Sequence, residues 1–206
     1  MNSILPSIMQ SIKPQYCELI AAGKKTIEVR KTKPNVSTPF KSYKYCTKGK
    51  LALLRDDEDA EEKYKYDHWE FAEFHQSCGK KILGGKVIGE YICDEIQEWV
   101  FDNETNSYDI SDDDLVLTCL TQEQLWEYGK GKTLYGYHIT NLKIYDEPKE
   151  LSQFNRPCKC LDEYEGEIYC DCLNCEDAGD SDYGIIACDR TIKRPPQSWC
   201  YVEEVS

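Results

Sequence analysis

Hydrophobic and polar residues alternate along several short segments of the chain, which is the pattern of β-strands with one buried face. Residues 26–31 place Ile27 and Val29 on one face and Glu28 and Arg30 on the other, so a half-buried strand with a polar face is predicted. The same alternation predicts β-structure in four further segments, namely 43–54 with a break near Gly49, 84–99 as one long strand, 134–145, and 197–203 as a closing strand.

Helical signals are fewer and shorter than strand signals. The segment 11–23 is predicted to form a short helix, because Pro14 suits the first helical position and Gly23 suits the left-handed position after a helix. The residues Thr121 and Gln124 have the spacing of a capping box, so another short helix is predicted to begin there. The acidic run 112–114 is read as a solvated loop, and 55–81 as a loop with a short helix.

The predicted order of elements is mixed, with strands dominant and helices few. This order favours an α+β fold built on an open or partly closed β-barrel with small helices over a doubly wound sheet. The chain has 206 residues with 40% hydrophobic and 31% charged residues, which is enough for a packed core. No run approaches the ~18 apolar residues of a membrane-spanning helix, and the first residues lack a secretory signal. A cytoplasmic protein without a membrane partner is therefore expected.

Charge is distributed unevenly along the chain. The net charge is −13, which argues against a protein coated with nucleic acid. Residues 1–50, however, hold ten Lys and Arg against only two acidic residues. This basic quarter on an acidic body predicts one local anion-attracting site. The alternative is scattered charge that is compensated in three dimensions.

The densest chemistry lies between Gly23 and Arg30. Glu28 and Arg30 share a face of the predicted strand, and Lys25 lies at its beginning. A carboxylate between two cations stays ionised, and it can bind the edge of a nucleobase while the cations hold a phosphate or carbonyl oxygen. Lys25 with a lowered pKa would alternatively act as a base or nucleophile. The plainer alternative is an ion pair on an exposed strand face.

The motif Gly23-x-Lys25-x-x-Glu28-x-Arg30 resembles the signature of the ASCH domain, a PUA-like β-barrel. Five further segments are similar to blocks of the small ASCH proteins found in phages and prophages, namely 11–14, 45–47, 85–90, 138–145 and 194–202. The resemblance implies a barrel of about five or six strands with a cleft beside the signature strand. It also implies recognition of RNA or of a modified nucleoside. Residues 55–82 and 158–190 look like insertions.

Some ASCH proteins are amidohydrolases that act on 4-acetylcytidine, and others are ribonucleases. In the amidohydrolases the catalytic Lys corresponds to Lys25, the catalytic Thr falls at Glu28, and the catalytic Glu falls loosely near Thr118. A ribonuclease would use Lys25, Glu28 and Arg30 as acid–base and phosphate-binding groups. Because the amidohydrolase pattern is kept at only one of three positions, we favour binding over catalysis. An acidic protein–protein regulatory module is the third possibility.

Further residues are predicted to lie beside the cleft. Aromatic rings on predicted strands provide stacking surfaces for bases, and a Lys before the first helix would reach the same place. These candidates are Lys13, Tyr45, Tyr137, His138 and Trp199. The alternatives are core packing for the aromatic residues, a hydrogen-bonded structural role for His138, and a solvated side chain for Lys13.

Six of the twelve Cys residues crowd into 158–188, within an acidic stretch that has too few aliphatic residues for a core of its own. The Cys172-x-x-Cys175 spacing lets two thiolates share a tetrahedral ion. A structural zinc site is therefore predicted, with Cys158, Cys172, Cys175 and Cys188 as the preferred set and Cys160 and Cys170 as alternatives. Disulfides and free thiols remain the other readings. The predicted organisation is a barrel domain of residues 1–157 and 190–206, interrupted by a zinc-stapled insertion of residues 158–189.

Metal analysis tests the zinc prediction. Purified protein should contain about one zinc ion per chain, because a closed site of four thiolates holds one tetrahedral ion. Elemental analysis after dialysis measures this stoichiometry, and Cys172→Ser with Cys175→Ser should remove the metal. Less than about half an equivalent in the wild-type protein would count against the site.

Overall fold

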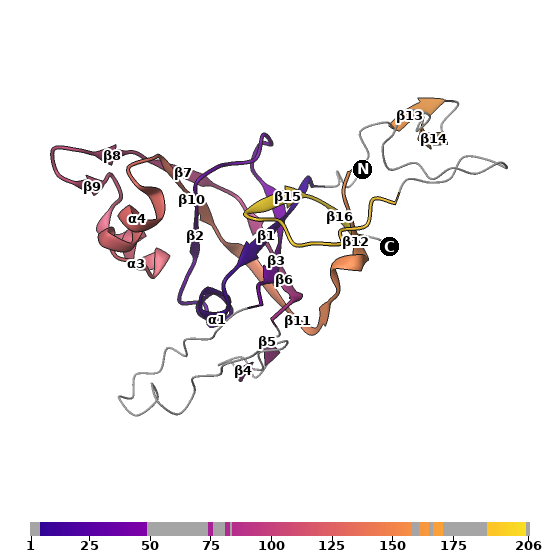
Figure 1. The fold of residues 1–206 in the computed structure, drawn as a ribbon, viewed down its shortest axis with the longest axis horizontal. Helices are drawn as coiled ribbons and strands as arrows, with labels where there is room; N and C mark the ends of the chain where they lie inside the picture. Colours follow the sequence, from indigo (N-terminus) through magenta and orange to yellow (C-terminus); the bar gives the residue numbers. More distant parts are fainter. Residues whose placement is uncertain are drawn as a thin grey trace.

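The computed structural model describes residues 5–48, 74–75, 81–82, 84–157, 161–164, 167–170 and 189–204. Strands dominate it and helices are few and short, which confirms the predicted α+β fold (Figure 1). The described strands that carry the site form a five-stranded and a three-stranded sheet rather than one closed barrel. No helix in the described part of the chain is long and apolar enough to cross a membrane.

The larger sheet has the strand order β11-β6-β3-β1-β15. Its strands are β11 (Thr140–Lys149), β6 (Lys86–Cys93), β3 (Phe40–Cys46), β1 (Ser7–Ile12) and β15 (Trp199–Tyr201). The pair β1 and β3 is parallel, and the other neighbours are antiparallel. The parallel pair is connected by a crossover that contains the first helix, α1 (Pro14–Ala21), as parallel strands require.

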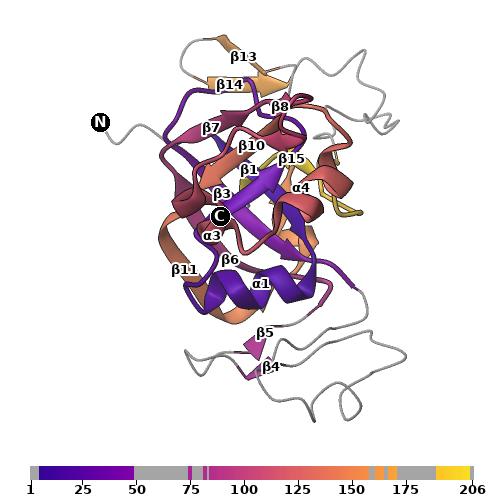
Figure 2. The same ribbon diagram turned by 90° about the vertical axis from the view of Figure 1, so that its left-hand side faces the viewer.

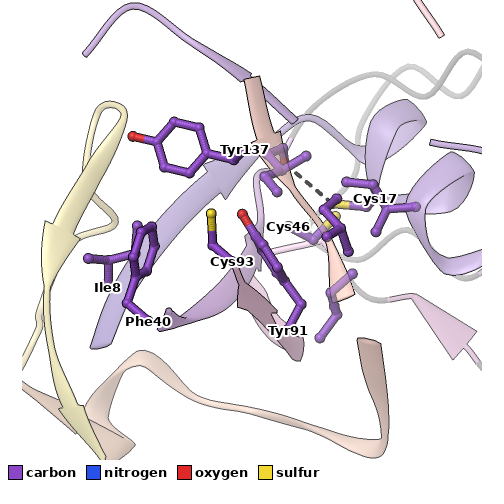
Figure 3. Close-up of a cluster of buried hydrophobic side chains, with 11 residues drawn as sticks. Ile8, Cys17, Phe40, Cys46, Tyr91, Cys93 and Tyr137 are labelled. Carbon is purple, nitrogen blue, oxygen red and sulfur yellow. Dashed lines mark hydrogen bonds between the residues drawn. The ribbon is translucent and has the colours of Figure 1, made fainter. Parts of the chain in front are cut away.

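The two faces of this sheet pack into different cores, because side chains alternate along each strand. One face carries Ile8, Phe40 and Tyr91, which pack with Tyr137 of the smaller sheet (Figure 3). Residues Cys17 and Ile20 of α1 close this first core, and Figure 2 shows α1 at one end of the strands. The opposite face forms a second core of Met9, Tyr43, Tyr45, Val87, Tyr145, Phe154, Ile192 and Val202.

The smaller sheet has the order β2-β10-β7, with β2 (Ile27–Arg30), β10 (Leu134–His138) and β7 (Ile96–Trp99). Its outer face carries Ile27, Val29 and Trp99, which pack against Leu125 in a third core. The helices α3 (Asp112–Thr118) and α4 (Gln122–Gly129) lie on this outer side in Figure 1. The inner face of β2, with Glu28 and Arg30, is thereby turned toward the larger sheet.

The remaining described elements are short. They are β4 (Phe74–His75), β5 (Lys81–Ile82), β8 (Phe101–Asp102), β9 (Ser107–Tyr108), the 3-10 helix η1 (Leu151–Gln153), β12 (Phe154–Asn155), β13 (Leu161–Tyr164), β14 (Glu167–Cys170) and β16 (Glu203–Glu204). Each of these strands pairs in a two-stranded ribbon that is not hydrogen-bonded to the two main sheets. Most of the predicted loop 55–81 lies outside the described residues.

Two predicted strands were wrong in extent, because each is two strands that belong to different sheets. The segment 84–99 divides into β6 and β7 at Asp94 and Glu95, and 134–145 divides into β10 and β11 at Ile139. Backbone hydrogen bonds fix the positions of these breaks. His138 N–H donates to the Glu95 carbonyl at 3.0 Å, which joins the two breaks, and Ile139 N–H donates to the Thr26 carbonyl at 2.8 Å. These chain corners place the smaller sheet against the larger one.

The predicted helices at 11–23 and from Thr121 are confirmed as α1 and α4, although residues 11–12 belong to β1, a strand that the pattern analysis missed. The reading of 112–114 as a loop was wrong, because these acids form the first turn of α3. The Ser111 hydroxyl accepts a hydrogen bond from Asp114 N–H at 3.1 Å, and acidic residues are favourable at a helix N-terminus.

Candidate functional site

A pocket of about 620 Å³ opens beside the beginning of β2. Its wall comes from the end of β1, the beginning of α1, the inner face of β2, and the exposed side of α4. Its described lining residues are Ser11, Ile12, Lys13, Tyr16, Lys25, Glu28, Val29, Arg30, Thr47, Leu120, Gln124, Glu127, Tyr128 and Gln197. The structure therefore brings four of the predicted site residues, Lys13, Lys25, Glu28 and Arg30, to one concave surface.

The polar face of β2 is buried rather than half-exposed, which corrects the strand predicted from alternation. All four residues of β2 are buried, with Glu28 and Arg30 each 6% exposed. Hydrophobic residues on the other face pack against α3 and α4, so the polar face is left to point into the interior between the sheets. The plain alternative of an ion pair on an exposed face does not describe this strand.

Glu28 is the only acidic residue among the described buried side chains, and cations surround it. One carboxylate oxygen, Oε1, lies 3.1 Å from the Arg30 guanidinium, and the other, Oε2, lies 3.5 Å from Lys25 Nζ. A buried carboxylate is strongly unfavourable unless cations or hydrogen-bond donors compensate its charge. The position of Glu28 therefore depends on these two neighbours.

Lys25 holds the beginning of β2 to the end of α3. Its ammonium donates to the carbonyl of Ile27 at 2.9 Å and to the carbonyl of Thr118 at 2.7 Å. Burial lowers the pKa of Lys25, whereas the nearby Glu28 carboxylate opposes that shift. Since two carbonyls accept hydrogen bonds from it and Glu28 lies 3.5 Å away as its ion-pair partner, Lys25 in this state positions other groups rather than presenting a free nucleophile.

The amidohydrolase resemblance puts a catalytic Glu near Thr118, and Thr118 itself has no carboxylate. Its hydroxyl donates to the Leu115 carbonyl at 2.6 Å and accepts from Leu120 N–H at 3.1 Å, so it finishes the turn of α3. The pocket does contain a second carboxylate, that of Glu127 on α4.

Arg30 connects β2 to the edge of the larger sheet. Its guanidinium donates to the Ser11 carbonyl at 2.9 Å and to the Ser198 carbonyl at 3.5 Å. Within the described part of the chain, Arg30 Nε and Glu28 Oε2 are buried and make no hydrogen bond. Two neighbouring side chains of the pocket wall therefore carry polar atoms without a hydrogen bond, although Glu28 Oε2 keeps its ion pair with Lys25.

A second set of buried polar groups lies on the facing sheet. Gln10 of β1 and Lys44 of β3 are opposite each other in register, and both are fully buried. Gln10 Oε1 accepts hydrogen bonds from the Ser42 hydroxyl at 3.1 Å and from the Tyr91 hydroxyl at 2.7 Å. Burial lowers the pKa of Lys44 to about 7, a shift that Glu28 opposes and that Lys25 and Arg30 reinforce. Lys44 is thus half protonated near neutral pH.

The other predicted aromatic residues lie elsewhere, and none is among the described residues that line this pocket. Tyr45 is in the second core and Tyr137 in the first core, where the Tyr137 hydroxyl donates to the Thr32 carbonyl at 2.7 Å. Trp199 Nε1 donates to the Thr32 hydroxyl at 2.9 Å, and His138 Nδ1 lies 2.9 Å from Asp94 Oδ1 in an exposed pair. Their roles in ligand binding stay predictions without support from the pocket.

The part of the pocket wall that comes from α4 was not predicted from the sequence pattern. Gln124, Glu127 and Tyr128 have the i, i+3, i+4 spacing of one helix face, opposite in character to the buried Leu125. That spacing was readable once the helix had been placed. Tyr16 of α1, which is only partly buried, also lines the pocket.

The predicted zinc ligands Cys158, Cys172, Cys175 and Cys188 lie outside the described residues. Within the described ranges, no group of three or more His, Cys, Asp or Glu side chains is arranged to hold a metal ion. The zinc site therefore stays a prediction from sequence, as does the division of the chain at residues 158–189.

Lys44 should make the stability of the protein depend on pH. Its pKa is about 7 in the folded protein and about 10.5 when exposed, so between these values the unfolded chain binds a proton that the folded protein does not. The free energy of unfolding therefore rises with pH in this range, by up to about 1.4 kcal/mol per pH unit from this group. Denaturant titrations at pH 7, 8 and 9 should show the rise.

The variant Lys44→Met keeps a long apolar side chain and removes the titrating amine. Its stability should exceed that of wild type at pH 7, and its slope between pH 7 and 9 should be smaller by one proton. Lys41→Met is the matched control, since Lys41 lies on the same strand but is partly exposed beside Glu90. An unchanged slope in Lys44→Met would contradict the assignment.

Comparison with known proteins places this chain near ASCH structures. No family model matches it, and no curated protein matches it. The crystal structure of ASCH from Zymomonas mobilis is similar at 15% sequence identity, with 71% of this chain and 75% of that chain covered and a TM-score of 0.45. Two single-residue variants of the same protein match at 16% identity with TM-scores of 0.46 and 0.43.

Proposed function

We propose that this protein binds RNA or a modified nucleoside in the pocket beside β2. The observation that carries the proposal is a pair of buried polar atoms on pocket-lining side chains that make no hydrogen bond within the described residues, namely Glu28 Oε2, whose ion pair is with Lys25, and Arg30 Nε. Buried polar atoms normally have partners, so two neighbouring exceptions in a concave site indicate groups that a ligand completes.

The edge of a nucleobase fits this arrangement. A base presents an N–H donor beside a carbonyl acceptor, which is the complement of a carboxylate oxygen beside a guanidinium N–H. The pocket volume of about 620 Å³ is within the range of small-ligand sites. Tyr16 and Tyr128 contribute aromatic rings to the wall, and a ring beside an unpaired base typically contributes ~1–3 kcal/mol by stacking.

Cations near the pocket favour ligands with phosphate groups. Lys13 lies at the beginning of α1 and lines the pocket, and Lys31 Nζ lies 4.5 Å from the ring centroid of Tyr128. Lys13, Lys25, Arg30 and Lys31 all belong to the basic first quarter of the chain. This local positive charge supports the single anion-attracting site expected from the charge distribution.

A hydrolase in the same pocket is the second candidate, and the observation that favours it is Glu127. Together with Glu28, this residue gives the pocket two carboxyl groups, which could serve as the general acid and the general base of a hydrolysis. Lys25 is engaged as a hydrogen-bond donor and would act by holding Glu28 in place. The acidic regulatory module remains a proposal that rests on residues 158–189.

Binding measurements with altered wall residues test the proposed function. Glu28→Gln keeps the size of the side chain and removes its charge, and Arg30→Lys keeps the charge and removes the guanidinium. Each should weaken binding of a single-stranded RNA decamer or of 4-acetylcytidine by about tenfold or more, since charge-assisted hydrogen bonds contribute roughly 1.5–3 kcal/mol. Isothermal titration calorimetry measures both ligands.

Lys33→Met is the matched control, because Lys33 follows β2 but pairs on the surface with Glu98 at 3.0 Å. Its affinity should equal that of wild type within about twofold. Equal affinity of wild type, Glu28→Gln and Arg30→Lys for both ligands would refute the proposal. Incubation of the same ligands with wild type and with Glu127→Gln decides the hydrolase, since turnover must be present in wild type and reduced in the variant.

A further inference from the structure

Lys44 is a buried amine behind the pocket wall, and its charge has no carboxylate partner among the described residues. Its side chain is fully buried, and within the described residues its Nζ makes no hydrogen bond. The ring of Tyr91 lies beside it, with 4.3 Å between Nζ and the ring centroid. Lys25 and Arg30, by contrast, donate to backbone carbonyls and to Glu28. An apolar residue would pack in this interior without the penalty of burying an amine.

Protonation of Lys44 increases the excess of positive charge among the described buried side chains. Three buried cations, Lys25, Arg30 and Lys44, then face the single buried carboxylate of Glu28, whereas only two do so when Lys44 is neutral. An uncompensated buried charge is strongly unfavourable, so the excess is reduced by one charge in either of two ways. Lys44 loses its proton, or an anion enters the pocket, which opens onto Lys25, Glu28 and Arg30.

We propose that the pocket takes a ligand with a negatively charged group, a phosphodiester of RNA, and that Lys44 takes up one proton from solvent as this group binds. The inference rests on the proposed function and specifies an anionic ligand over a neutral nucleoside. The phosphodiester offsets the positive field of Lys25 and Arg30, which otherwise disfavours the ammonium form of Lys44. No covalent bond of the ligand changes, and the proton passes from buffer to Nζ.

Lys44 acts as a positioning residue in this scheme, because it lies behind the wall and does not line the pocket. The protonated amine adds attraction for the anion through the interior, where charges are poorly screened. Binding and protonation therefore strengthen each other, as linkage requires. The phosphodiester affinity rises as pH falls toward 7, whereas that of a neutral nucleoside does not depend on Lys44.

Two of the titratable groups around Lys44, Cys17 and Tyr91, do not account for this proton near neutral pH. Lys25, Glu28 and Arg30 face it from the β2 segment, Gln10 from β1, Cys17 from α1, and Tyr91 from β6, with Cys46 on its own strand. Figure 3 shows Cys17 and Cys46 side by side at this end of the core, with Tyr91 near them. Burial raises the pKa of the Cys17 thiol and of the Tyr91 hydroxyl well above their ordinary values, so both stay protonated.

Calorimetry with the dinucleoside phosphate UpU tests the inference, because its phosphodiester does not titrate between pH 6 and 9. Titrations at pH 8 in two buffers of different ionisation enthalpy report the number of protons taken up. At this pH roughly nine-tenths of the Lys44 side chains are neutral before binding, so more than about half a proton per bound UpU is expected. Uptake should be close to zero at pH 6, where Lys44 is already protonated.

The variant Lys44→Met should bind UpU without proton uptake and with an affinity that no longer changes between pH 7 and 9. The control Lys41→Met should keep both properties of wild type. Uridine should bind all three proteins more weakly than UpU and without proton uptake. The pH profile of the wild type decides the question by itself if Lys44→Met fails to fold.

The outcomes separate this inference from the proposed function. UpU binding with no proton uptake, uridine binding as tight as that of UpU, or uptake that persists in Lys44→Met would each overturn the inference and leave nucleic-acid binding intact. Failure of wild type to bind UpU, uridine, 4-acetylcytidine and the RNA decamer alike would remove the proposed function, and the inference with it.

Discussion

The arrangement of the whole site depends on the buried carboxylate of Glu28 and on the cations that hold it. Arg30 lies 3.1 Å from this carboxylate and reaches the backbone of Ser11 and Ser198, while Lys25 reaches the backbone of Thr118. One carboxylate thereby connects the smaller sheet to β1, to the segment before β15, and to the end of α3. The network that joins these elements is also the wall of the pocket, so packing and ligand recognition share the same side chains.

Such an interior is unfavourable compared with an apolar one of the same shape. Buried ion pairs are often no more stabilising than well-packed hydrophobic residues, and an unpaired buried amine is worse. The core nevertheless has Gln10 and Lys44 opposite each other. Among the described residues, neither Gln10 Nε2 nor Lys44 Nζ has a hydrogen-bond partner. Features that lower stability behind the wall of a concave site are those expected where function opposes stability.

Local elements could be predicted from the sequence because their causes are local. Pro14 and Gly23 define the ends of α1, and the Thr121–Gln124 capping box defines the beginning of α4. The sheet to which a strand belongs has no such local cause. Strand-forming residues continue on both sides of Asp94 and of Ile139, while the chain turns there from one sheet to the other. These corners are fixed by bonds to residues far along the chain, which a window of neighbouring residues does not contain.

The same difference between local and long-range causes explains which parts of the site could be predicted. Lys25, Glu28 and Arg30 are neighbours on one strand, so their common face follows from a period of two. Their direction does not follow from it, because it depends on α3 and α4 covering the opposite face. Lys44 was missed for a different reason. Phe40, Ser42, Lys44 and Cys46 occupy alternate positions of β3, and the ends of this series are apolar. Because it shares these alternate positions with Phe40 and Cys46 along the strand, this Lys falls on the buried face of β3. Its role depends on Gln10 and Glu28, which come from other strands. The sequence of one strand therefore shows that a Lys occupies a buried position, and only the folded structure shows which groups surround its amine.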